Sequence, residues 1–227
     1  MPQTREEKES TAVEFHRVAR FPRVVGAIDC THVRLQSPGG NMAENFRNRK
    51  GYFSLNVQVV CNATTKITDV VVRWPGSTHD SYIFNNSAVR VKFETEEVNN
   101  WILLGDSGYP LRPYLLTPLD NPNTAAEHLY NEAQIRTRNI VERTFGIWKR
   151  RFPILSMGIR TKVPLAQAIV VATTIIHNIA SQNHDELPQN EEDIINDIPN
   201  NPVGQEDEAG ATVRTSFINY FEQLLLN

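Results

Sequence analysis

The sequence predicts an α/β fold in which a mixed sheet of about five strands carries helices on both faces. Three observations predict it. Three strand-like segments follow one another closely between residues 24 and 74, a helical segment comes next, and two short apolar runs precede a strongly helical second half. Strands joined by short turns form antiparallel neighbours, whereas a helix between strands allows a crossover. Such a sheet buries its apolar faces under helices.

The first elements are a helix and a short strand. Residues 4–20 (TREEKESTAVEFHRVAR) begin with Thr4 and Glu7 at the spacing of a capping box, which predicts a helix. The apolar run from Val24 to Ile28 is typical of a buried strand. We expect this strand to end at Asp29.

A hairpin follows. Residues 52–61 (YFSLNVQVVC) alternate between apolar and polar side chains, and residues 67–74 (ITDVVVRW) form a third strand-like run. The polar residues 62–65 between them are typical of a turn. Pro75 and Gly76 end the third strand. The three strands therefore form an antiparallel meander.

The crossover helix is expected to run from Ser77 or Thr78 to about Phe93, because a small hydroxyl residue favours a helix start. Residues 101–105 (WILLG) and 113–117 (PYLLT) are then short enough and apolar enough for two more strands. These two strands complete the sheet of five.

Helices dominate the rest of the chain. Residues 125–151 are strongly helical, and residues 164–182 form a nearly all-apolar helix that we expect to be buried. That helix is interrupted by polar residues, so no membrane span is predicted. Residues 183–211 read as an acidic disordered linker, and residues 212–227 as a C-terminal amphipathic helix.

Composition and charge narrow the functional classes. The chain has 227 residues, of which 40% are apolar and 22% charged, so it is an ordinary globular protein. Two cysteines make no disulfide framework, and the charged N-terminus is no secretory signal. The net charge of −3 conceals an acidic tail, because residues 184–227 hold ten acidic residues against one Arg. Residues 136–162 hold eight basic residues and one acid, which fits either a phosphate-binding surface or a solvated helix face.

Three acidic residues stand where sites form in such a fold. Asp29 ends the first strand, Asp106 ends the fourth, and Glu142 lies on the basic helix. Sites in open α/β sheets form at strand ends, so the three carboxylates are expected to converge. Crowded carboxylates need a cation, and oxygen ligands suit Mg²⁺ or Mn²⁺. Two such ions can assist an in-line phosphoryl displacement.

The helix over 125–151 supports this interpretation. In a helical projection, Arg138, Glu142 and Lys149 lie together beside an apolar stripe that contains Phe145 and Trp148. Glu142 is therefore expected at the edge of the core, beside cations that could bind a phosphate backbone. A simple surface ion pair between Glu142 and Arg138, one turn apart, is the alternative.

Five motifs together resemble the Harbinger transposase-derived nuclease family, in the order of that family and over roughly residues 21–180. They are GAIDCTHV at 26–33, NRKGYFSLNVQVVC at 48–61, WPGSTHDSYIF at 74–84, LLGDSGYPLRPYLLTPL at 103–119 and RTRNIVERTFGIWKRRFP at 136–153. The resemblance implies a ribonuclease-H-like fold, the fold of the retroviral integrase superfamily. It also implies a DDE-type metal-dependent nuclease. The chain then divides into an N-terminal helix (1–20), a nuclease domain (21–182), the linker (183–211) and the terminal helix (212–227).

The resemblance also assigns roles to residues. The family's three catalytic and metal-binding acids map onto Asp29, Asp106 and Glu142, with two Mg²⁺ or Mn²⁺ ions as cofactors. Asp80, in the family's His–Asp segment, is a further candidate for a role near the metal, and a helix-start acid is the alternative reading. The basic residues expected to bind DNA are Arg138, Lys149 and Arg150.

DNA is the expected partner, and no membrane association is expected. About twenty residues precede the first strand, which is too short for the helix-turn-helix region that relatives carry there. We expect either a truncated gene product or DNA targeting by another chain, such as the separate Myb-like protein that accompanies family members. The expected location is the nucleus, with the cytoplasm as a second location. The oligomeric state is left open.

A non-enzymatic alternative remains. A domesticated transposase can keep its fold as a catalytically silent DNA- or protein-binding module. In that case the acidic tail and the terminal helix would bind the partner.

Overall fold

The structure is a computed structural model that describes residues 1–95, 101–183, 185 and 204–226. Five strands form one sheet in the order β3-β2-β1-β4-β5. The strands are β1 (Val24–Arg34), β2 (Ser54–Cys61), β3 (Ile67–Pro75), β4 (Ile102–Leu104) and β5 (Leu115–Leu116). β1 pairs antiparallel with β2 and parallel with β4, so the predicted meander followed by a crossover is confirmed.

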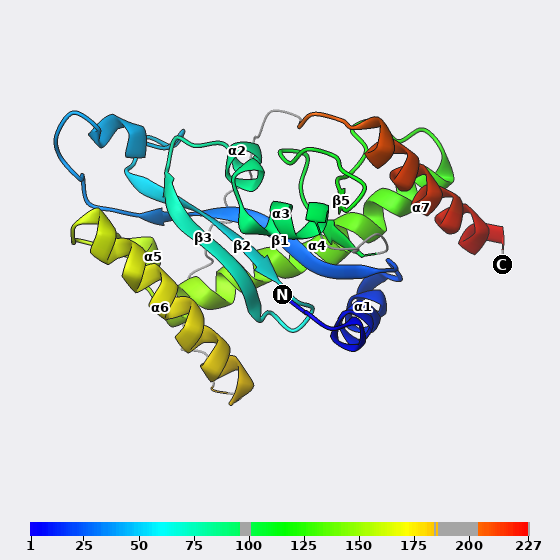
Figure 1. Ribbon diagram of the computed structural model, residues 1–227, viewed down its shortest axis with the longest axis horizontal. Coiled ribbons are helices and arrows are strands. Elements are labelled where there is room, and N and C mark those ends of the chain that lie inside the picture. The colour runs from blue at the N-terminus through cyan, green and yellow to red at the C-terminus, as the bar shows by residue number, and fades with distance from the viewer. Residues whose placement is uncertain (96–100, 184, 186–203, 227) are drawn as a thin grey trace.

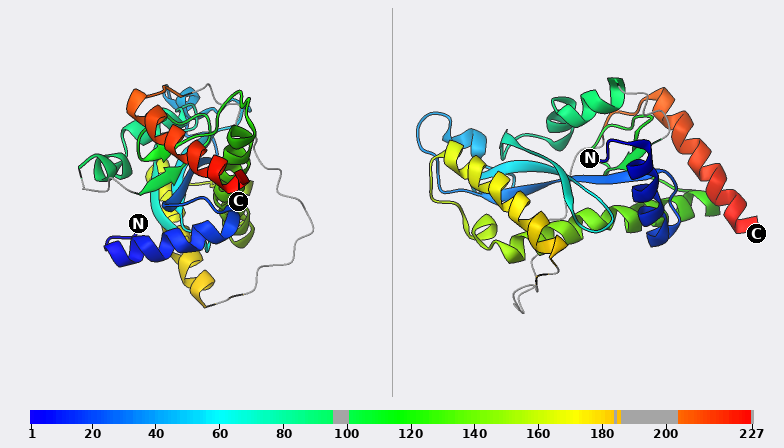
Figure 2. Two further views of the ribbon diagram at one scale, coloured as in Figure 1. Left: turned by 90° about the vertical axis from the view of Figure 1, so that its right-hand side faces the viewer. Right: turned by 60° about the horizontal axis from the view of Figure 1, so that its bottom comes forward.

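Helices cover the sheet on both faces, as predicted. They are α1 (Arg5–Ala19), α2 (Asp80–Asn85), α3 (Ala88–Thr95), α4 (Ala125–Arg151), α5 (Ile154–Met157), α6 (Val163–Gln182) and α7 (Glu208–Leu226), with a short 3₁₀ helix η1 (Ala43–Phe46). The sheet lies between α3 on one side and the long α4 on the other (Figures 1 and 2). One core cluster joins the sheet to α1, α4, α6 and α7, and a second joins its other face to α2 and α3.

Local sequence signals explain several of these elements. Thr4 and Glu7 form the predicted capping box of α1, and Thr124 and Glu127 form a second one that starts α4. α4 covers the predicted residues 125–151. Each box satisfies backbone N–H groups that the first helical turn leaves without partners.

Gly26 allows β1 to run in the centre of the sheet. A Cβ atom at Gly26 would lie 2.7 Å from Cγ1 of Val60 and 2.8 Å from Cδ2 of Leu103, on the strands at either side. The register with β4 shifts between Val24 and Gly26. A larger residue here would push apart the strands that carry the acidic residues.

Two predictions about element boundaries were wrong. The first strand does not end at Asp29 but continues to Arg34, because β2 pairs with it along that whole length. The helix expected from residue 77 or 78 to 93 is two helices, α2 and α3, broken at Asn86 and Ser87. The Ser87 hydroxyl donates to the Phe84 carbonyl and accepts from the Arg90 N–H, so it ends one helix and caps the next.

The apolar helix α6 is not buried as expected. Its inner side packs against β3 and α4, but large aliphatic side chains such as Ile175 and Ile179 are exposed. Among the described residues, α6 is also the one helix that could cross a membrane by length and apolar composition, and 33% of its most apolar stretch is buried. An apolar composition alone does not say which face of a helix is covered.

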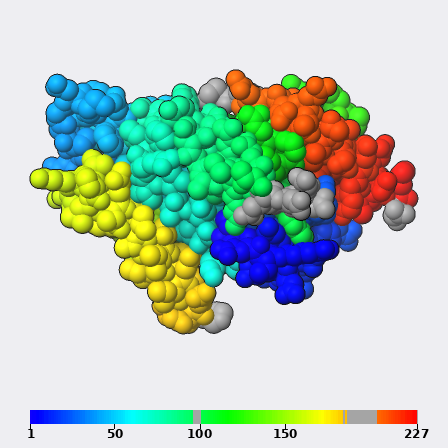
Figure 3. Space-filling view, in the orientation of Figure 1, coloured from blue at the N-terminus to red at the C-terminus, as the bar shows by residue number. Residues whose placement is uncertain are grey.

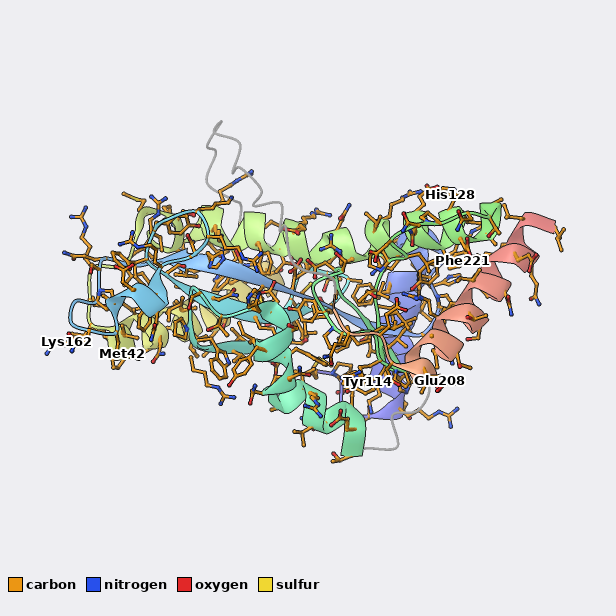
Figure 4. The ribbon with its side chains drawn as sticks, turned by 90° about the horizontal axis from the view of Figure 1, so that it is seen from above. Met42, Tyr114, His128, Lys162, Glu208 and Phe221 are labelled. Atoms are coloured by element: carbon orange, nitrogen blue, oxygen red, sulfur yellow. The ribbon has the colours of Figure 1, made fainter. Side chains whose placement is uncertain are left out.

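The C-terminal region departs from the predicted linker. α7 begins at Glu208, four residues earlier than expected, and Leu111 forms a parallel bridge with Glu206. Phe217 and Phe221 of α7 pack on Phe21 with ring-centroid distances of 5.2 and 5.5 Å. Figure 4 labels Phe221 on α7. Residues 204–211 are therefore part of the folded unit. The rest of the predicted disordered segment, except residues 183 and 185, lies outside the described residues.

Candidate active site

Asp29 and Asp106 lie on neighbouring strands, although Asp29 is not at a strand end. The pairing of β1 with β4 stops at Ala27 and Leu104, so Asp29 lies just past the end of β4. Asp106 follows β4 by two residues. The two carboxyl groups interact electrostatically, since Asp106 is the strongest charged influence on the pKa of Asp29. The end of β4, rather than the end of β1, defines this site.

Asp106 is held by its own turn and by α4. Its Oδ1 accepts a hydrogen bond from the Gly108 N–H at 3.0 Å. Gln134 of α4 donates its Nε2 to the Gly105 carbonyl at 2.8 Å, so the helix fixes the residue just before Asp106. Asp106 is 8% exposed, which leaves it at the edge of solvent.

α4 brings the third acid and a compensating cation. Nη1 of Arg138 lies 2.8 Å from Oδ2 of Asp29 and 3.5 Å from Oε1 of Glu142. Arg138 and Glu142 are one helical turn apart and thus share a face. Arg138, expected to bind DNA phosphate, bridges two of the three acids in this structure. These contacts bring Asp29 and Glu142 together, and the charges of Asp106 and Glu142 both raise the pKa of Asp29. Both observations support the predicted convergence of the three acids.

The site has an excess of negative charge, and its carboxyl groups are largely shielded from solvent. Burial raises the pKa of Asp29 well above its usual range, Asp106 raises it further, Arg138 lowers it, and Glu142 raises it again. Arg138 bridges two carboxyl groups and Asp106 adds a third that acts on Asp29, so the site favours additional positive charge. Asp29 is 1% exposed and cannot be screened well by water.

The donor atoms fit a hard divalent cation. Three carboxyl groups offer oxygen ligands of the kind that Mg²⁺ and Mn²⁺ prefer. As the side chains stand, however, no three His, Cys, Asp or Glu groups among the described residues are arranged tightly enough to hold a metal. Both oxygens of Asp29 are engaged, Oδ1 by the Cys30 N–H at 2.7 Å and Oδ2 by Arg138. A cation bound at Oδ2 would therefore share that oxygen with Arg138 or displace the guanidinium from it.

Asp80 lies on the face of the sheet opposite to the face on which Asp29 lies. Successive side chains of a strand point to opposite faces, and Asp29 faces α4 while Cys30 contacts the Tyr109 hydroxyl at 3.3 Å. Asp80 accepts a hydrogen bond from Asn56 Nδ2 at 2.8 Å and influences the pKa of Cys30. It acts on Asp29 only as the weakest of the named charges. A direct role at the metal stays a prediction for Asp80.

The predicted DNA-binding residues Lys149 and Arg150 lie near the end of α4, both partly exposed. Burial lowers the pKa of Lys149 to about 8, Glu142 raises it and Lys50 lowers it. Lys149 thus lies near both the acidic group and the loop that carries Lys50. In the same loop Nη2 of Arg49 lies 2.8 Å from Nδ1 of His79. From the sequence, this loop (NRKG) was used only as part of a family motif, and its basic residues were assigned no DNA-binding role.

A second feature that the sequence analysis did not predict is a pair of backbone hydrogen bonds between the turn after Asp106 and residues 204 and 205. We call this pair of hydrogen bonds the brace. Gly204 donates its N–H to the Ser107 carbonyl at 2.8 Å, and the Leu111 N–H donates to the Gln205 carbonyl at 3.0 Å. A Cβ atom at Gly204 would lie 2.0 Å from the Tyr109 carbonyl oxygen. The sequence did not reveal these contacts, because residues 204 and 205 lie in a segment with the polar, acidic composition of a linker.

The chain is similar to proteins of known families. A family model described as DDE superfamily endonuclease matches residues 28–178. Relatives named "Putative nuclease HARBI1" are 39% identical over 170 residues in Mus musculus and 36% identical over 173 residues in Homo sapiens. These matches cover 74% and 75% of this chain and 48% and 49% of the relatives. A relative named "Protein ALP1-like" from Arabidopsis thaliana is 25% identical over 76% of this chain and 47% of its own length. The chain spans about half the length of the curated relatives it matches, and no solved structure matches it.

Proposed function

Because the chain belongs to the DDE superfamily endonucleases, a nuclease family that includes the Harbinger transposase-derived proteins, we propose that it is a divalent-metal-dependent nuclease acting on DNA. The reaction would be hydrolysis of a phosphodiester bond or transfer of a DNA strand. The observation that carries the proposal is that Arg138 bridges Asp29 and Glu142 while Asp106 is the strongest charged influence on Asp29. The sheet order, with one acid on the central strand and one after its parallel neighbour, supports a ribonuclease-H-like fold.

Asp29, Asp106 and Glu142 are the residues that would hold Mg²⁺ or Mn²⁺, as two ions. Bound ions supply Lewis-acid stabilisation to the attacking and leaving oxygens of a phosphodiester. Asp29 is fixed by the Cys30 N–H and Asp106 by the Gly108 N–H, so each offers its carboxyl group in a set orientation. The backbone thus preorganises two of the three ligands.

Arg138 has two roles in this proposal. Without another cation it neutralises Asp29 and Glu142, as its 2.8 and 3.5 Å contacts show. When the carboxylates have another positive partner, its guanidinium becomes available for a phosphate oxygen of the substrate, which it can bind in a bidentate manner. Arg138 would therefore act as a counter-ion first and as a phosphate-binding residue second.

Lys149 and Arg150 extend the phosphate-binding surface along α4. Lys149 lies near Lys50, so basic residues from the helix and from the loop before β2 gather beside the acids. Basic residues gathered on one surface are the electrostatic pattern of a nucleic-acid-binding site. We further propose a nuclear protein, also present in the cytoplasm, whose DNA targeting comes from a separate Myb-like chain.

Cleavage of supercoiled plasmid DNA with Mn²⁺ tests the proposal. We expect the wild type to nick or linearise the plasmid and Asp106→Asn to lose at least about 100-fold in rate, because the amide keeps the shape but not the charge. Asp120→Asn, at an exposed position, is the matched control and should cleave like the wild type. Equal cleavage by wild type and Asp106→Asn would refute a catalytic role for Asp106.

A catalytically silent binding module is the second candidate. It is favoured by one observation, that Arg138 already fills the space between Asp29 and Glu142 and that no ready metal group is present among the described residues. In this case DNA binding would persist with a chelator and in Asp29→Asn, and no metal would give cleavage. Binding that needs Mn²⁺ would argue against the silent module.

A further inference from the structure

α6 carries an exposed apolar stripe along its whole length. The large side chains in it are exposed to 39–56%, and two exposed alanines lie between them. The stripe consists of Leu165, Ala168, Val171, Ala172, Ile175, Ile176 and Ile179. Figure 3 shows α6 at the outer surface of the molecule, at the lower left. Isolated exposed aliphatic residues are normal, but a contiguous apolar patch marks an interaction site.

The orientation of this stripe is fixed by contacts on the inner side of α6. His177 Nε2 lies 2.9 Å from the Thr65 carbonyl, and Asn178 exchanges two hydrogen bonds with the backbone of Ile67 at 2.7 and 2.8 Å. Trp148 of α4 donates its Nε1 to Thr173 at 3.2 Å. These bonds to β3, the hairpin and α4 prevent α6 from rotating to bury the stripe.

The stripe has the spacing and the charge of a helix-pairing surface. Leu165, Ala168, Ala172, Ile175 and Ile179 alternate in steps of three and four, which is the a/d pattern of paired helices. α6 contains no Asp, Glu, Lys or Arg. Two copies of α6 could therefore approach without like-charge repulsion.

We propose that the stripe binds the same stripe of a second copy of this chain, with the two α6 helices antiparallel. In that arrangement Ala168 faces Ile179 of the partner and Ala172 faces Ile175 of the partner, so each layer combines one small and one large side chain. The pairing overlaps α6 over its full length and gives a two-fold symmetric interface, in which the same patch serves both copies.

α5 supplies further exposed apolar side chains beside the start of α6. Specific interfaces bury about 1,200–2,000 Å² in total, which is more than a single pair of helices supplies. α5 is separated from α6 by five residues and adds Met157, 78% exposed, and Ile154, 42% exposed. α5 lies at the end of the molecule where α6 starts (Figure 1).

Sedimentation equilibrium of the full chain tests the proposal. We expect the wild type to show twice the 25.8 kDa mass of the chain and Ile175→Glu to show the monomer mass, with an unchanged circular dichroism spectrum at the same concentration. Val13→Glu is the matched control, because Val13 is 52% exposed on α1, and it should remain a dimer. A monomeric wild type at tens of micromolar, or a dimer that survives Ile175→Glu, overturns the proposal. A monomeric wild type that floats with phosphatidylcholine vesicles would assign the stripe to a membrane instead.

A charge-pair rescue tests the register. Ala168→Lys and Ile179→Glu should each be monomeric alone, because each places a charge in an apolar layer. Mixed in equal amounts they should form a heterodimer, since residue 168 of one copy faces residue 179 of the other in the proposed antiparallel pairing. No recovery on mixing, with both variants folded, would refute this register.

Discussion

Arg138 determines the charge balance at the site, and it shows how far sequence reasoning reaches at the residue scale. The spacing of Arg138 and Glu142 on one helix face was readable from the sequence, and so was the chain position of Asp29. The 2.8 Å contact between Arg138 and Asp29 was not, because it joins residues 109 positions apart. That contact depends on how α4 crosses the sheet.

Metal binding at the three acids is expected to stabilise the folded protein against thermal unfolding. With a dissociation constant of ~1 mM, ~10 mM Mn²⁺ would stabilise the fold by about 1.4 kcal/mol. That corresponds to roughly 3–6 °C in a thermal melt. Asp106→Asn should lose this shift and Asp120→Asn should keep it.

The raised pKa of Asp29 determines how the Mn²⁺-induced stabilisation depends on pH. Its pKa is raised in the folded protein, so the folded state takes up this proton at a higher pH than the unfolded chain. Without metal, the stabilising effect of that proton is complete at low pH and is lost as the pH rises through the raised pKa. Because Mn²⁺ competes with the proton, the Mn²⁺-induced shift should shrink as the pH falls through the same range. A shift that grows on acidification would contradict the assignment.

Lys149 gives a second pH-dependent prediction. Burial lowers its pKa to about 8, so it loses its charge between pH 7 and pH 9. DNA affinity of the wild type should therefore fall over that range, whereas Lys149→Arg should keep its affinity because arginine stays protonated. Fluorescence anisotropy with a labelled duplex at constant salt measures both. An identical fall in the two proteins would exclude Lys149 as a DNA-binding residue.

At the scale of elements, the long helices and the meander followed by a crossover were predicted from periodicity and turn signals, whereas the buried side of each element was not. α4 was predicted to its last residue, since its apolar stripe is a local feature. α6 was expected to be buried because its composition is apolar, but burial depends on which elements lie beside it. The extension of β1 to Arg34 likewise depends on its partner β2.

The brace at Gly204 leads to a prediction about the turn after Asp106. Gly204→Ala would place a methyl group against the Tyr109 carbonyl, and relieving such a clash costs about 1–3 kcal/mol. We expect faster amide exchange in residues 106–111 and a smaller Mn²⁺-induced shift. Gly146→Ala on α4 is the control, because a Cβ there meets nothing within 4 Å. Unchanged exchange in residues 106–111 would show that the brace does not support the site.

At the scale of the whole molecule, α7 belongs to the main core rather than to a tail. Phe217 and Phe221 are 2% and 1% exposed, and both pack on Phe21. The acidic composition of the C-terminal region concealed this, because only a few apolar residues anchor it. Arg214, 7% exposed and 2.8 Å from Glu206, shows that even a charged residue of α7 is enclosed.

Removal of residues 204–227 should therefore prevent cooperative folding. Loss of a buried Phe costs about 3–5 kcal/mol, and two of them approach the whole stability of a typical domain, about 5–15 kcal/mol. We expect a broad, non-cooperative thermal melt for this truncation. A shorter truncation after Leu224 removes the exposed Leu225 and Leu226 together with residue 227, and it should melt like the full chain. A sharp melt from the longer truncation would show that α7 is dispensable.

The brace also has a consequence for the order of events during synthesis. Ser107 and Leu111 bond to residues 204 and 205, which the ribosome adds more than ninety positions later. Asp29 on β1 and Asp106, which follows β4, can come together while translation continues, since domains begin to fold from the N-terminal side. The turn after Asp106 acquires its last support only when the C-terminal residues have emerged. A nascent chain that has not yet reached residue 204 thus lacks a completed site, so a nuclease built in this way would gain activity only after this segment has emerged.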